Sequence, residues 1–125
     1  MIAIDSSAMI AFLSGEKGAF ADAAARALEQ QHACLPPVVL AELLSEPTLP
    51  AGVAALLKAL PRLDITDGYW ERAGALRRSV LKKSLRARLA DSLIAQSCID
   101  HRVPLATADR DFRHFQSLGL IVLQA

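Results

Sequence analysis

The stretch "MIAIDSSAMIAFL", residues 1–13, contains the change of hydrophobic pattern that decides the fold. Its first four residues form a short apolar run that ends at Asp5, a pattern typical of a buried strand. Ser6 and Ser7 follow as candidate N-caps of a helix, and Gly15 lies near the expected helix end. A strand that leads directly into a helix favours an α/β architecture.

The rest of the chain continues this alternation of helices and strands. Helical spacing, N-caps and prolines predict further helices over 17–31, 37–46, 51–60, 68–85 and 87–101, with Asp67 as a candidate cap of the fourth. Short apolar runs predict strands over 33–35, 62–66, 103–107 and 119–124. Alternating strands and helices indicate a mainly parallel sheet covered on both faces. Such sheets bind ligands beyond the carboxyl ends of their strands.

Composition limits the class of protein. The chain has 125 residues, of which 53% are hydrophobic and 22% charged, so we expect one domain spanning residues 1–125. A formal net charge of +1 favours neither a nucleic-acid nor a membrane partner, and no apolar run reaches membrane-spanning length. The N-terminus lacks a basic signal region, and Cys34 and Cys98 lie in apolar surroundings typical of buried thiols. These features predict a cytoplasmic protein.

Four acidic residues stand out by position. Asp5 and Asp109 follow predicted strands, while Glu42 and Asp91 share helix faces with apolar residues. Each has an ordinary alternative as a helix cap, a turn residue or a salt-bridge partner. Together, carboxylates at one sheet edge repel one another unless a cation is present. Oxygen ligands suit Mg²⁺ or Mn²⁺, which activate water for phosphodiester hydrolysis.

Four motifs carry a resemblance to a known family. They are "IDSSAMIAFL" around Asp5, "AELLS" around Glu42, "DSLIAQ" from Asp91 and "LATADRDF" around Asp109. In this order, and in a chain of this length, they resemble the PIN domain, and in particular the VapC toxins of bacterial toxin–antitoxin pairs. The resemblance implies a three-layer α/β/α sandwich around a central, mainly parallel sheet. It also implies a Mg²⁺- or Mn²⁺-dependent endoribonuclease.

The family's functional residues carry over to matching positions. The resemblance implies a catalytic set with Asp5, Asp91 and Asp109 as the metal ligands; the complete set is Asp5, Ser7, Glu42, Asp91, Thr107 and Asp109. Thr107 is expected to hydrogen-bond and orient a carboxylate or a metal-bound water. Two departures from the family pattern matter. Ser6 stands where the family often has Thr, and Asp111 is a second candidate for the fourth acid or a cap of the turn over 112–115.

The resemblance further implies an RNA substrate, a homodimer and a small antitoxin. The antitoxin of such a pair wraps the toxin, and exposed apolar positions for it are expected at Met9, Phe12, Leu13 and Phe20, whose alternative is core packing. Seven of the 14 basic residues fall between Arg72 and Arg88. This imbalance favours phosphate contacts by Arg86 and Arg88, with Arg110 as a further candidate, although a solvated helix face explains the run equally well.

Two other functions compete with the nuclease. The first is a non-catalytic PIN-like domain that binds RNA or protein while its acids satisfy only local hydrogen bonds. The second, a phosphoacceptor receiver, is disfavoured because Asp5 is followed by two serines and the last predicted strand is not followed by Lys. The histidines show no metal-ligand spacing, and a Gly-rich phosphate loop is missing from the sequence.

Overall fold

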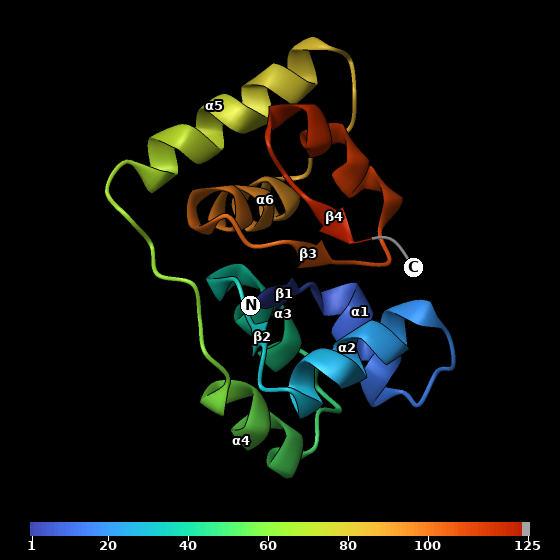
Figure 1. Cartoon of the computed structure of the whole chain (residues 1–125). Helices are drawn as coiled ribbons and strands as arrows, with labels where there is room; N and C mark the ends of the chain where they lie inside the picture. The colour runs from blue at the N-terminus through green and yellow to red at the C-terminus, as the bar shows by residue number, and fades with distance from the viewer. Residues whose placement is uncertain (124–125) are drawn as a thin grey trace.

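A computed structural model describes residues 1–123, except for the side chain of Phe20. Helices and short strands alternate along it (Figure 1). The elements are β1 (Ile2–Ile4), α1 (Ser6–Leu13), α2 (Ala19–Glu29), β2 (Ala33–Cys34), α3 (Pro37–Leu44), α4 (Ala51–Ala59), α5 (Tyr69–Lys82), α6 (Leu89–His101), β3 (Leu105–Ala106), the 3₁₀ helix η1 (Arg110–Leu118) and β4 (Val122–Leu123).

The four strands form one parallel sheet in the order β2-β1-β3-β4. In its centre Ile4 of β1 lies opposite Ala106 of β3, and both residues are buried. Helices α1 and α2 pack together on one side of the sheet, while α5, α6 and η1 gather on the other (Figure 1). The predicted three-layer α/β/α sandwich with a parallel sheet is therefore confirmed.

A single apolar core holds these layers together. Its largest fully buried side chains come from both helical layers and from the sheet, and they include Met9, Ile94, Leu105, Phe112 and Phe115. Because few aromatic residues are available, small aliphatic side chains fill most of the remaining space. Among residues 1–123, no helix is both long enough and apolar enough to cross a membrane.

Three local predictions are wrong. The segment 62–66 is not a strand but makes one isolated bridge, between Leu35 and Arg62, because its next residues are mostly exposed. Helix α1 has Asp5, not a serine, at its N-cap position. Helix α5 begins after Gly68, whose φ of 79° is left-handed, and not after a capping Asp67. Gln124, the end of the last predicted strand, lies outside the described residues.

Candidate active site

The sheet register brings the first and the last acidic motif together. Since Ile4 pairs with Ala106, the residues that follow these strands, Asp5 and Thr107, emerge side by side at the carboxyl edge. The Asp5 backbone N–H donates to the Ala106 carbonyl at 3.0 Å, which continues the strand pairing up to the site. The edge that strand polarity singles out for a functional crevice thus carries the first candidate carboxylate.

Three hydroxyls surround the Asp5 carboxylate, which is only 4% exposed. Ser7 Oγ and Thr107 Oγ1 both donate to Asp5 Oδ2, at 2.9 and 2.7 Å. Ser6 Oγ makes a longer contact of 3.4 Å with Oδ1. These contacts fix the rotamer of Asp5 and occupy mainly one of its oxygens. The other oxygen has acceptor capacity left for a ligand.

The same hydroxyls fix the loop after β3. The Ala108 N–H donates to Ser7 Oγ and the Asp109 N–H donates to Thr107 Oγ1, both at 3.0 Å. Asp109 Oδ1 in turn accepts the Asp111 N–H at 2.9 Å, so Asp109 caps η1. The expectation that Asp111 caps this turn is wrong. A carboxylate that caps one helix with one oxygen is held in a defined orientation at the sheet edge.

Glu42 reaches the site from α3. Ser6 Oγ donates to Glu42 Oε1 at 3.3 Å, so this one hydroxyl lies between Asp5 and Glu42. Burial raises the pKa of Glu42, and the negative charge of Asp5 raises it further. Glu42, whose ordinary alternative was a place at the edge of the apolar face of its helix, is therefore electrostatically coupled to Asp5 at the sheet edge.

Asp91, in the first turn of α6, completes the group. Its pKa is raised to about 6, first by burial and then by the negative charges of Asp109 and Asp5. The positive charge of Arg88 partly offsets this effect, and Glu42 adds to it. Within residues 1–123, none of the four carboxylates has a Lys or Arg within 4.0 Å. The four acids thus share a negative potential that Arg88 offsets only in part.

The donor set suits a hard cation, although the ligands are not gathered tightly. In the described part of the chain, no three His, Cys, Asp or Glu side chains lie close enough to ligate one ion together. Mg²⁺ commonly binds through only one or two carboxylates and keeps several waters. Carboxylates and hydroxyls at one sheet edge fit such a partly hydrated ion. Joint ligation by Asp5, Asp91 and Asp109 stays a prediction.

A family model of the PIN domain matches residues 2–118, almost the whole chain. The chain belongs to the PIN domain family. The predicted family is thereby confirmed, and the candidate acids lie where the sheet of this PIN domain ends.

Solved structures share this fold. One is a VapBC2 complex of Rickettsia felis bound to a promoter DNA fragment, with 19% identity, a TM-score of 0.75 and 98% of each chain covered. Another is FitAcB of Neisseria gonorrhoeae, with 18% identity, a TM-score of 0.73 and coverage of 99% of this chain and 97% of that one. A third is VapBC-5 of Mycobacterium tuberculosis, with 20% identity, a TM-score of 0.66 and coverage of 98% and 97%. The comparison with curated proteins gives no match.

An apolar and acidic groove adjoins the acids of this PIN domain. It has a volume of about 370 Å³ and lies between α1, α3 and the loop after α3. Its lining includes the exposed Ile10 and Leu13 of α1 together with Glu42 and Glu46. Of the apolar positions expected to be exposed on the early helices, Leu13 lines this groove, whereas Met9 is buried in the core. The side chain of Phe20 lies outside the described residues.

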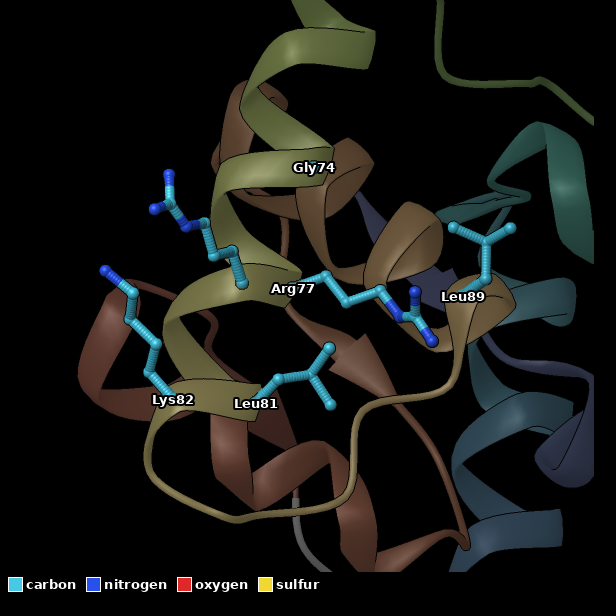
Figure 2. A pocket seen from close by; sticks show the side chains of 6 residues that line it. Gly74, Arg77, Leu81, Lys82 and Leu89 are labelled. Atoms are coloured by element: carbon cyan, nitrogen blue, oxygen red, sulfur yellow. The ribbon is translucent and has the colours of Figure 1, made fainter.

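The predicted phosphate-binding arginines lie around the acidic site. Arg86 is exposed and makes a long ion pair with Asp111, at 3.9 Å. Arg88 precedes α6 and acts electrostatically on Asp91, while Arg110 is exposed at the start of η1. Earlier in the basic run, Arg77 and Lys82 line an open groove on α5 (Figure 2).

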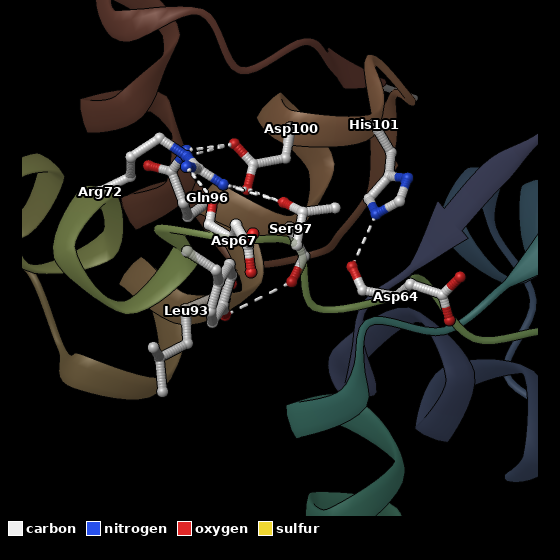
Figure 3. A network of polar contacts seen from close by, with 10 residues as sticks. Asp64, Asp67, Arg72, Leu93, Gln96, Ser97, Asp100 and His101 are labelled. Carbon is white, nitrogen blue, oxygen red and sulfur yellow. Dashed lines mark hydrogen bonds and ion pairs between the residues drawn. The ribbon is translucent and has the colours of Figure 1, made fainter.

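Arg72 departs from this pattern, because it is not free to bind a substrate. It contacts both oxygens of Asp100 through Nε at 3.0 Å and Nη2 at 2.7 Å, and Nη2 also donates to Thr66 (Figure 3). Gln96 donates to the same Asp100 at 2.8 Å. This network fastens the segment before α5 to α6. No motif predicts it, because its members are ordinary polar residues at unrelated positions in the chain.

Proposed function

We propose that this PIN domain is the toxin of a VapBC-type toxin–antitoxin pair and acts in the cytoplasm as a metal-dependent endoribonuclease. One observation carries the proposal. Asp5, Glu42, Asp91 and Asp109 come from four separate segments to one edge of the sheet, where burial and then the negative charges of the other acids raise the pKa of Asp91 to about 6. Keeping ionised carboxylates together costs free energy, which a bound divalent cation would recover.

The residues have separate roles in this proposal. Asp5, Asp91 and Asp109 would hold Mg²⁺ or Mn²⁺, which supplies charge stabilisation and an acidified water when bound. Ser7 and Thr107 orient Asp5, and Ser6 connects it with Glu42. Glu42 is placed to position water or accept a proton, since burial and Asp5 raise its pKa. Arg86, Arg88 and Arg110 would hold the phosphates of the RNA.

The antitoxin is the proposed protein partner. The groove beside Glu42 combines exposed Ile10 and Leu13 with two glutamates, so it suits a peptide segment that carries apolar side chains and an arginine. The solved structures of VapBC2 and VapBC-5 are complexes of the same fold, which supports such a partner. A homodimer is proposed on the family resemblance alone.

The decisive test is RNA cleavage by the Asp5→Asn variant. We expect the parent protein to cleave unstructured RNA with Mg²⁺ or Mn²⁺ and Asp5→Asn to be slower by at least about a hundredfold, because a charged oxygen that holds the cation is lost. Asp22→Asn changes an exposed aspartate on α2 and should leave cleavage unchanged.

Unchanged cleavage by a folded Asp5→Asn protein would contradict the catalytic proposal. A parent protein that binds RNA but does not cleave it with either metal would favour the non-catalytic alternative. Sequencing of RNA ends after induction, with Asp5→Asn as the control, would then identify the cleaved RNA.

A further inference from the structure

A second feature, separate from the acids, is an open groove along α5. It has a volume of about 440 Å³, which falls in the range of about 300–1,000 Å³ typical of small-ligand pockets. Five of its lining residues come from α5 and one from the start of α6, namely Gly74, Arg77, Arg78, Leu81, Lys82 and Leu89. The α5 residues recur at helical spacing, so they form one face of that helix.

The apolar part of this groove is left uncovered. Leu81 is 46% exposed and Leu89 is 59% exposed, and they lie on facing sides of the groove (Figure 2). Gly74 has no side chain, so it adds room at the far end of the groove. Two large exposed leucines around an open space form a surface on which a flat apolar group can lie.

The cations of the groove are not neutralised. In the described chain, Arg77, Arg78 and Lys82 have no carboxylate within 4.0 Å. Arg77 crosses the groove toward Leu89, and its Nε donates to the Ala87 carbonyl at 2.9 Å (Figure 2). That bond holds the guanidinium in place and leaves its planar face available. A positioned guanidinium stacks on bases and also binds phosphate.

The groove and the acidic site lie near each other at the start of α6. Leu89 begins α6, and Asp91 lies in the first turn of the same helix. Arg88 directly precedes Leu89, and its positive charge acts on Asp91, where it partly offsets the raised pKa. A chain molecule bound in the groove would therefore lie close to Arg88 and Asp91.

We propose that this groove binds a single-stranded stretch of the RNA substrate beside the cleavage position. An unpaired base lies against Leu81, Leu89 and the Arg77 guanidinium, and the flanking phosphates contact Arg78 and Lys82. The proposal rests on the ribonuclease function proposed above and assigns this groove to an unpaired stretch of that RNA. Duplex RNA fits poorly, because its bases are stacked inside the helix and are not free to contact the leucines.

Charge argues against a second copy of the chain as the occupant. Pairing two such grooves would bring three unpaired cations of one copy against three of the other. A polyanion instead gains from every one of them.

The test is RNA binding without cleavage. Fluorescence anisotropy in EDTA would compare a labelled single-stranded RNA of about ten nucleotides, within the usual size of single-strand sites, with a duplex of equal length. For Arg78→Gln/Lys82→Gln we expect roughly tenfold weaker single-strand binding. The salt slope should become shallower by about 1.4, which is two phosphate contacts at about 0.7 each.

Two further variants keep the result specific. Arg26→Gln/Lys58→Gln removes two exposed charges from α2 and α4 and should bind RNA like the parent. Leu81→Ala/Leu89→Ala changes only exposed side chains. It should weaken single-strand binding by about three- to tenfold with the salt slope unchanged, because base contacts are lost and phosphate contacts are kept.

Equal losses in the groove variant and in the α2–α4 variant would overturn the proposal, as would equal affinity of the parent for single strand and duplex. It would also be overturned if Leu81→Ala/Leu89→Ala dissociated a dimer in sedimentation while RNA binding stayed the same. Since EDTA removes cleavage from this assay, failure here is distinguishable from failure of Asp5→Asn to abolish cleavage.

Discussion

The two ends of helix α6 carry aspartates with opposite electrostatics. Burial and other acids raise the pKa of Asp91, in the first turn, whereas hydrogen bonds from Arg72 lower the pKa of Asp100, in the last turn. The helix dipole alone predicts the reverse, because it stabilises negative charge at the N-terminus and destabilises it at the C-terminus. Neighbouring groups therefore outweigh the dipole at both ends.

The difference separates a structural carboxylate from a candidate functional one. Asp100 has bonds from Arg72, Gln96 and Thr66, so its charge is used within the fold (Figure 3). Asp91 shares its surroundings with three more carboxylates and has no ion-pair partner within 4.0 Å among residues 1–123. An acid in a group of acids, whose charge Arg88 offsets only in part, supports the cation site that we propose.

The largest expected effect is on catalysis. Asp91→Asn should slow RNA cleavage at least about a hundredfold and yet stabilise the metal-free protein, because it removes a charge that is partly buried and repelled by other acids. After allowance for solvent screening of this half-buried group, the gain in unfolding free energy is about 1–2 kcal/mol. Asp100→Asn should do the opposite, with cleavage kept and stability reduced by about 0.5–1 kcal/mol. Cleavage rates and urea denaturation in EDTA measure both. Destabilisation by Asp91→Asn would contradict the comparison.

Metal binding gives the next largest effect. Mn²⁺ at about a hundred times its dissociation constant should stabilise the folded protein by about 2.7 kcal/mol. Asp109→Asn should abolish the resulting rise in melting temperature, since it removes the charge of one proposed ligand, which is also the η1 cap. Asp100→Asn should retain the rise. Differential scanning fluorimetry with and without Mn²⁺ checks this, and an equal rise in all three proteins would place the metal elsewhere.

The smallest effect is on pH dependence. A raised pKa means that folded Asp91 takes up a proton between about pH 6 and pH 4 while the unfolded chain does not, so stability in EDTA rises as pH falls. Glu42 acts in the same direction. The lowered pKa of Asp100 stabilises the fold above about pH 4, and this contribution is lost as pH falls further. The urea midpoint, measured from pH 3 to 7, should pass through a maximum. In Asp91→Asn the midpoint should rise less as the pH is lowered from 7 to that maximum. In Asp100→Asn it should fall less as the pH is lowered further. A curve that Asp91→Asn leaves unchanged would refute this assignment.

The order of motifs predicted the fold and the placement of the acids because both depend on local patterns. An apolar run that ends in Asp5 indicates strand polarity, and polarity indicates the edge where Asp109 also emerges. The role of Thr107 as a hydrogen-bond donor to a carboxylate was predicted from the family resemblance, and Thr107 does donate to Asp5. Metal ligation and the phosphate contacts of Arg86, Arg88 and Arg110 stay predictions.

What the sequence did not reveal depends on distant side chains. Arg72 belonged to a basic run, and only the fold brings it to Asp100. The segment around Asp64 has the residue pattern of a strand, but it makes only the single bridge at Arg62. Beyond that bridge a side chain holds it, because His101 hydrogen-bonds the Asp64 carbonyl at 2.7 Å (Figure 3). In the sequence, Ser6 only departs from the family pattern. The fold places its hydroxyl between Asp5 and Glu42.

The hydrogen bond between Thr107 and Asp5 joins positions 102 residues apart. During translation, β1 leaves the ribosome first, yet it must wait for β3 before the acidic edge exists. The acidic edge therefore depends on a contact between segments far apart in the chain, and chain-closure entropy opposes such a contact until both segments are in place.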